Sequence, residues 1–199
     1  MKNTTLRSMI LTALFAALTA IGAFLKITMP HVSFTLQVFF TCMAGLLLGP
    51  YWGAASQLVY VLLGLVGLPI FTEGGGLMYV AKPTFGFLLG LIPMAFVVGL
   101  MTRDLPYRRK KQRLPDGPQV QMQLLSRPKQ LLRIALAELV GLAALYVIGL
   151  PYLYIALGGL WSLKKTIVSG CLIFLPFDAI KLICEAFLSV RLVPLLRKK

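Results

Sequence analysis

Long stretches without a charged residue constrain this chain more than any other feature of its sequence. A helix needs about 20 apolar residues to cross the hydrocarbon core of a bilayer. Hydrophobic residues make up 58% of the chain and charged residues 13%, against ~25% charged in soluble proteins. One core could not cover that much apolar surface, which predicts an integral protein of the lipid bilayer. The charge-free stretches are Ser8–Leu25, Val32–Thr72, Pro83–Thr102 and Leu139–Leu163.

These stretches divide the chain into segments of helical length. In lipid every backbone polar group must find its partner within the span, so helices are expected. The unbroken apolar runs argue against the alternating strands of a membrane barrel. We predict an all-α integral membrane protein, a single domain built as a bundle of six transmembrane helices. The predicted helices cover residues roughly 7–26, 34–50, 53–69, 84–102, 129–150 and 167–192.

Basic residues gather at the two ends of the chain and in one polar connector at about 103–128. Within that connector, RDLPYRRKKQR carries six basic residues and one acidic residue. Because cytoplasmic loops are enriched in Lys and Arg, the N and C termini and this linker are predicted to be cytoplasmic. The net charge of +14 is then explained by topology and by contact with anionic lipid, and nucleic acid is not an expected partner.

Few residues could support a metal site or catalysis. His31 is the single histidine, and the three cysteines, Cys42, Cys171 and Cys184, all lie within predicted spans. Buried cysteines in apolar helices usually serve as small packing residues. We therefore predict no metal site, no cofactor and no catalytic residue in this chain.

Two charges stand in the middle of the apolar segment CLIFLPFDAIKLICEAFL, residues 171–188. Asp178 and Lys181 are three residues apart, which places them on one face of a helix. A charge at the centre of a membrane helix costs about 2.5–3.5 kcal/mol on insertion scales, and such residues often mark substrate paths. They either neutralise each other or form a polar site for a ligand, and we favour the site. Glu185 extends the same stripe, and we expect it to pair with a basic neighbour.

A glycine-rich connector separates the third and fourth predicted helices. Its three consecutive glycines are Gly74, Gly75 and Gly76. Glycine allows backbone conformations that are closed to other residues, and the spacing of a nucleotide-binding P-loop is missing. We predict a wall or lid over an outward-facing pocket, with Glu73, Tyr79 and Lys82 as its polar contributors. A plain connector is the alternative.

Small residues form one face of the first predicted helix. Such faces let membrane helices approach closely. The neighbouring helix belongs either to this chain or to another chain, and the sequence does not decide between them. The face consists of Ala13, Ala16, Ala17 and Ala20.

Five stretches together resemble the BioY family, the biotin-capturing S components of energy-coupling factor (ECF) transporters. Four of them are FTLQVFF, AGLLLGPYWG, YVLLGLVGLPIF and GGGLMYVAKPTFGFLLG. The fifth and most specific is FLPFDAIK, which aligns Phe174, Pro176, Asp178 and Lys181 with the family pattern. The resemblance runs from about Thr4 to Arg197 and thins out in the linker.

The resemblance implies a six-helix bundle in the bacterial cell membrane that binds biotin without changing it. The pocket would lie near the outer surface, walled by the last three helices and covered by outer loops. Asp178 and Lys181 would contact the ureido ring or the carboxylate of biotin, and a polar residue beside the glycines, here Glu73, would reach the ligand. Candidate aromatic wall residues are Tyr79, Trp161, Phe174 and Phe177.

The resemblance also implies partners. Ala13 and Ala17 match the Ala-x-x-x-Ala motif by which S components dock on the transmembrane coupling subunit. Two ATPase subunits would use ATP to drive a toppling of the S component, since this chain has no Walker motif. Two other function classes compete with this hypothesis: an intramembrane hydrolase or protease, and a self-sufficient carrier of a small solute.

Overall fold

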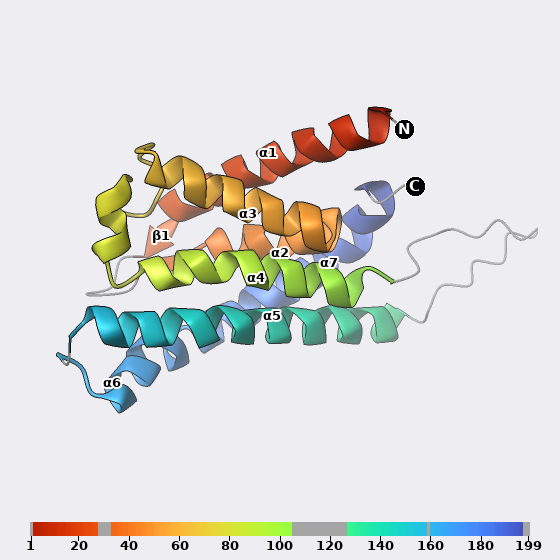
Figure 1. Cartoon of the computed structure of the whole chain (residues 1–199). Coiled ribbons are helices and arrows are strands. Elements are labelled where there is room, and N and C mark those ends of the chain that lie inside the picture. Colours follow the sequence, from red (N-terminus) through yellow and green to blue (C-terminus); the bar gives the residue numbers. More distant parts are fainter. Residues whose placement is uncertain (1, 28–32, 105–126, 159, 197–199) are drawn as a thin grey trace, which may run out of the picture.

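The computed structural model describes residues 2–27, 33–104, 127–158 and 160–196. Helices dominate the chain, with a two-stranded antiparallel hairpin near its start in which Lys26 pairs with Thr35. The long helices lie side by side in a bundle (Figure 1). In chain order the elements are α1 (Lys2–Phe24), β1 (Lys26–Ile27), β2 (Phe34–Thr35), α2 (Gln37–Leu48), α3 (Pro50–Leu65), the short 3₁₀ helix η1 (Leu77–Ala81), α4 (Phe85–Thr102), α5 (Arg127–Ala156), α6 (Leu163–Ile167), the π-helical turn η2 (Val168–Leu172) and α7 (Leu175–Leu196).

The all-α membrane architecture is confirmed, with six helical regions once α6, η2 and α7 are taken together. Among the described residues, four regions are long and apolar enough to cross a membrane. With 12 and 16 residues, α2 and α3 are only about 18 and 24 Å long, less than the ~30 Å of a bilayer core. The four long regions are Thr5–Phe24, Phe85–Thr102, Lys129–Ala156 and Leu163–Ser189.

The last predicted helix, 167–192, differs most from the structure. It begins earlier, at Leu163, and is interrupted by the π turn before α7 starts at Leu175. Pro176 lies at the start of α7, where its missing N–H breaks no helical hydrogen bond. The fifth helix runs past its predicted end at 150 and through Pro151 to Ala156.

One residue, Gly49, joins α2 to α3. Its φ of 84° is a conformation that favours glycine, and Pro50 begins α3 directly after it. The predicted break over Gly49–Gly53 is therefore shorter than expected. On either side of this link Gly45 and Gly53 meet, and a Cβ at Gly53 would lie 2.9 Å from the Gly45 Cα. The two short helices thus pack backbone to backbone.

The two ends of the bundle differ. Both termini lie at one end, together with the C-terminal end of α4 and the N-terminal end of α5; we call this the terminal end (Figure 1). The opposite end carries β1, η1 and α6, and we call it the hairpin end. Most of the predicted basic linker, residues 105–126, lies outside the described residues, as does His31.

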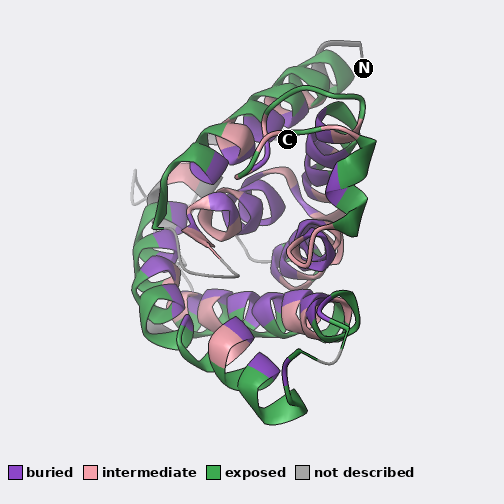
Figure 2. Cartoon of the chain, turned by 90° about the vertical axis from the view of Figure 1, so that its left-hand side faces the viewer, coloured by how far each residue is buried: buried purple, intermediate pink, exposed green. Residues whose placement is uncertain are grey.

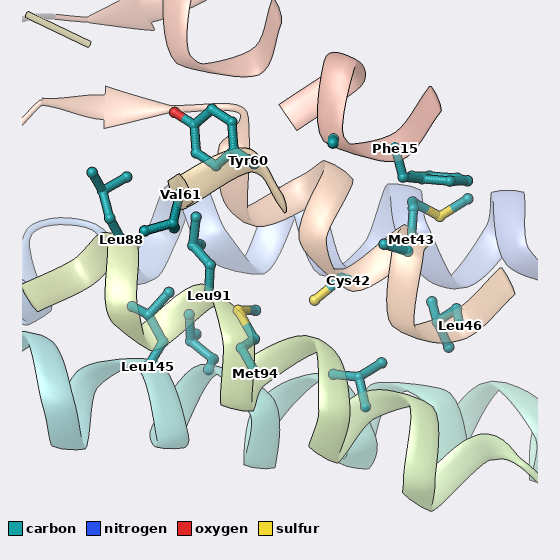
Figure 3. Packing of buried hydrophobic residues seen from close by; sticks show 14 of the residues in the cluster. Phe15, Cys42, Met43, Leu46, Tyr60, Val61, Leu88, Leu91, Met94 and Leu145 are labelled. Carbon is teal, nitrogen blue, oxygen red and sulfur yellow. The ribbon is translucent and has the colours of Figure 1, made fainter. Parts of the chain in front are cut away.

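Apolar side chains fill the bundle and also cover its outside. A view from the hairpin end shows buried residues facing inward and exposed residues facing outward (Figure 2). Close packing around Tyr60, Met94 and Leu145 forms part of the core (Figure 3). Outward-facing apolar residues such as Leu62 and Val147 remain exposed. A bundle that is apolar on both sides fits a lipid environment.

Candidate ligand-binding site

A cavity lies at the hairpin end. It encloses about 660 Å³ of space free of protein atoms, a volume that includes the open space at its mouth. Its walls come from β2, α2, η1, α4, α5, the π turn and α7. The mainly apolar part of the wall consists of Phe34, Val38, Phe87, Leu88, Leu91, Leu145 and Phe174.

Asp178 and Lys181 both line this cavity and are buried in it. The Lys181 ammonium lies 3.0 Å from one carboxylate oxygen of Asp178. It also donates a hydrogen bond of 2.9 Å to the Thr35 carbonyl and lies 3.9 Å from the centre of the Phe34 ring. Two of its three N–H donors are thus accounted for by described residues. The charges are paired with each other, and they also face the space a ligand would fill.

The second carboxylate oxygen of Asp178 accepts a hydrogen bond of 2.8 Å from the Tyr146 hydroxyl. Tyr146 comes from α5 and also lines the cavity. A carboxylate can accept about four hydrogen bonds, and Lys181 and Tyr146 supply two. Asp178 therefore retains acceptor capacity on a wall that is otherwise mostly apolar. Such a group is suited to a ligand that offers N–H donors.

Gln37, the first residue of α2, places an amide at the cavity. Its carbonyl oxygen accepts from the Thr35 hydroxyl at 3.0 Å, and its amide nitrogen donates to the Tyr60 hydroxyl at 2.8 Å. Tyr60 in turn donates to the Ile70 carbonyl at 3.1 Å. These bonds fix the amide, which still has a second N–H to offer.

The structure brings some predicted residues to the cavity and leaves others away from it. Tyr79 and Phe174 line it. Phe177 is 40% exposed and is not part of the wall; its ring packs 4.9 Å from the ring of Phe34, centre to centre. Trp161 is buried in a separate small cluster instead.

Within the glycine-rich connector, Thr72 and Tyr79 line the cavity, whereas Glu73 and the three consecutive glycines are not among its lining residues. Glu73 forms an exposed ion pair of 2.7 Å with Lys82. Gly74 and Gly76 have φ values of 106° and 97°, and the Gly76 N–H bonds the Gly64 carbonyl at 2.7 Å. A Cβ at Gly75 would lie 2.1 Å from the Leu68 carbonyl oxygen. The glycines therefore serve to fold the connector back onto the end of α3.

Two further expectations are corrected. Glu185 has no basic partner among the described residues, and the only side-chain donor beside it in that part of the chain is the weakly donating Cys42 thiol. On α1, Ala13 and Ala17 are exposed and Ala20 is half-buried, whereas Ala16 is buried in the core. Successive small residues point to different sides of the helix, so Ala16 does not belong to an outward face.

Tyr146, Thr35 and Gln37 were not singled out from the sequence, yet they form the polar wall together with Asp178. One signal was present, because Gln37 is a polar residue in a charge-free segment. Tyr146 offered none, since tyrosine is common near the ends of apolar helices.

Comparison with known proteins identifies the family of this chain. The sequence model of the BioY family matches residues 1–198. The chain belongs to the BioY family. Among its relatives, the probable biotin transporter BioY of Lysinibacillus sphaericus is 41% identical over 166 residues, 83% of this chain and 74% of that protein. The biotin transporter BioY of Thermotoga maritima is 32% identical over 94% of this chain and 96% of its own length.

The fold of this BioY family member also matches a solved structure. A crystal structure of the S-component for biotin from an ECF-type ABC transporter superimposes with a TM-score of 0.74. The superposition covers 96% of this chain and 93% of the S-component chain, and the two sequences are 24% identical. The bundle therefore has an S-component fold.

Proposed function

We propose that this chain is the biotin-binding S component of an ECF-type ABC transporter in the bacterial cell membrane. The observation that carries the proposal is the buried pair of Asp178 and Lys181, which lines the cavity and is held there by Tyr146. Membership of the BioY family adds the ligand, because relatives carry the name of biotin transporters. The chain binds and delivers the vitamin, and is not an enzyme.

The ureido ring of biotin suits this wall. It offers two N–H donors and one carbonyl acceptor, and Asp178 has two acceptor positions left beside Lys181 and Tyr146. The third N–H of Lys181 meets the ureido carbonyl. The apolar bicyclic ring and chain then lie against Phe174 and its apolar neighbours, a combination typical of small-molecule sites.

Lys82 is our candidate partner for the biotin carboxylate. It lies in sequence between Tyr79 and Thr84, which both line the cavity. Its ammonium is 4.9 Å from the centre of the Tyr79 ring, and its partner Glu73 is an exposed residue whose ion pair contributes little. The biotin carboxylate can therefore replace Glu73 as the partner of Lys82 at a small cost in free energy. Lys181 is a less suitable partner, because it is already paired with the buried Asp178.

The β1–β2 hairpin is proposed as the cover of the site. Lys26 of β1 donates to the Thr72 carbonyl of the neighbouring connector, and Lys181 donates to Thr35 of β2. The Lys181 ammonium thus bonds both Asp178 of the ligand wall and Thr35 of the hairpin. Biotin enters at this end of the bundle, which faces outward in our proposal.

The terminal end is then cytoplasmic, together with both chain ends and the basic linker. All of these lie at one end of the bundle (Figure 1), and six basic residues of the linker fit the positive-inside rule. In this arrangement all six helical regions cross the bilayer, with α2 and α3 lengthened by the hairpin and the glycine-rich connector.

We propose that Ala13 and Ala17 form the docking contact for the transmembrane coupling subunit. Both are exposed on α1, and small residues allow a partner helix to approach closely. Two ATPase subunits bound to the coupling subunit supply the energy, and the docked chain topples to release biotin inside.

Equilibrium binding of radiolabelled biotin to the purified chain, without ATP or partner subunits, tests the function. We expect saturable one-to-one binding in the nanomolar range, about −12 kcal/mol, with biotin recovered unchanged. Recovery of a cleaved or modified product would support the hydrolase alternative. Absence of binding by a folded chain would overturn the proposal.

A further inference from the structure

Two carboxyl groups lie in the core outside the cavity. Glu138 on α5 and Glu185 on α7 are fully buried. None of their four oxygens has a nitrogen or oxygen hydrogen-bond partner among the residues that the structure describes, and the Cys42 thiol beside Glu185 is a weak donor. A buried polar group without a partner costs roughly 1–3 kcal/mol, and an isolated carboxylate costs far more. These two groups therefore need an explanation that the biotin site does not supply.

The helix register places the two carboxyls opposite each other. The hydrogen bond between Tyr146 and Asp178 fixes α5 against α7, and the two helices run in opposite directions (Figure 1). Glu138 precedes Tyr146 by about 12 Å along α5, and Glu185 follows Asp178 by about 10.5 Å along α7. The steps are eight and seven residues, about 2.2 and 1.9 helical turns, and residues at these spacings belong to the same side of a helix. The pair thus lies about two turns from the cavity floor, toward the terminal end.

The surroundings offer little to neutralise two negative charges. The titratable groups that act on Glu185 are Glu138 of α5, Cys42 of α2, and Lys181 and Asp178 of α7 itself. Lys181 is already bound to Asp178 and Thr35. Negative charges on both glutamates would repel each other strongly in this low-dielectric interior. In the described part of the chain, no cluster of three or more metal-ligating residues provides a coordination sphere for a metal ion.

We propose that Glu138 and Glu185 form an intramembrane proton-binding site. Each carboxyl holds a proton on one oxygen and is neutral while α5 and α7 pack as observed. Both protons come from water and return to water only when the two helices separate and the carboxyls become hydrated. Proton binding and the packing of α5 against α7 are therefore linked, so that each favours the other. This site is distinct from the biotin site and does not depend on the identity of the ligand.

Infrared spectroscopy of the purified full chain in lipid nanodiscs tests the proposal directly. We expect the carbonyl-stretch band of protonated carboxylic acids at neutral pH, with a downshift in D₂O. E138Q and E185Q should each remove part of the band, and the double variant should remove it. E73Q is the matched control, because Glu73 is exposed and paired, and it should leave the band unchanged. A folded wild-type chain without the band would overturn the proposal, whether or not the variants fold.

Thermal unfolding as a function of pH gives an independent readout. The folded chain binds more protons at this site than the unfolded chain, so wild-type stability should fall as pH rises from about 4.3, where an unfolded glutamate ionises, through neutral. The glutamine side chain has the shape of a neutral glutamic acid but no proton to lose. The double variant E138Q/E185Q should therefore be more stable than the wild type at neutral pH and lose this part of the pH dependence. A double variant that keeps the wild-type pH profile would overturn the proposal. Neither readout involves biotin, so a failure of the proton-site proposal can be distinguished from a failure of the proposed function.

Discussion

The Tyr146 hydroxyl of α5 donates a hydrogen bond of 2.8 Å to the Asp178 carboxylate of α7. This bond joins two helices at the cavity wall and orients the carboxylate that we assign to the ureido group. A hydrogen bond to a charged group contributes roughly 1.5–3 kcal/mol. Its loss should therefore be visible in ligand affinity.

Tyr146→Phe should weaken biotin binding about tenfold or more, because about 1.4 kcal/mol corresponds to a factor of ten. Isothermal titration calorimetry on the purified chain measures the change. Tyr154→Phe is the control on the same helix, since Tyr154 is exposed and should leave the affinity unchanged. Equal affinities for Tyr146→Phe and the wild type would show that Asp178 does not need this bond.

Asp178→Asn and Lys181→Met separate ligand binding from simple charge neutralisation. Lys181→Met leaves Asp178 buried without its cation and should lower stability by about 3–5 kcal/mol. Adding Asp178→Asn should recover much of that stability, because no unpaired charge remains. Biotin affinity should stay at least tenfold reduced in the double variant. Recovery of both stability and affinity would mean that the pair only neutralises itself.

Lys82→Met should weaken the binding of biotin while leaving the binding of biotin methyl ester little changed. The reason is that the ester lacks the negative charge for which we propose Lys82. Competition against radiolabelled biotin measures both affinities. Glu73→Gln is the matched control, and it should change the affinity less than twofold because the Glu73–Lys82 pair is exposed. An equal loss for acid and ester would place the carboxylate elsewhere.

Alanine positions on α1 should separate docking from folding. Ala13→Trp and Ala17→Trp add bulk to exposed positions, so melting temperature and biotin affinity should be unchanged while co-purification with the coupling subunit is lost. Ala16→Trp adds the same bulk inside the core and should lower the melting temperature by several degrees or prevent folding. Full transport by Ala17→Trp would overturn the proposed docking contact.

Much of the cavity's charged wall could be predicted because its signal is local. Asp178 and Lys181 lie one turn apart in one apolar helix, so spacing and the cost of burial indicate their importance. Tyr146 and Thr35 reach them across 32 and 146 residues of sequence, and such contacts leave no local pattern. The three-residue glycine run was placed near the ligand for its backbone freedom, but the same freedom serves the turn at the end of α3. Helix ends differed where Gly49 alone replaced the predicted break and where a π turn interrupts the helix predicted over 167–192.

Three of the buried charged residues, Asp178, Lys181 and Glu185, belong to α7. If α7 entered lipid alone, each of these side chains in its charged form would cost about 2.5–3.5 kcal/mol of insertion free energy. In the folded bundle α2 and α5 surround them with protein instead. During biosynthesis α7 leaves the ribosome after all the other described helices. Stable insertion of α7 therefore depends on α2 and α5 being already packed in the membrane. A substitution that loosens the packing of α2 or α5 would first impair the membrane insertion of α7.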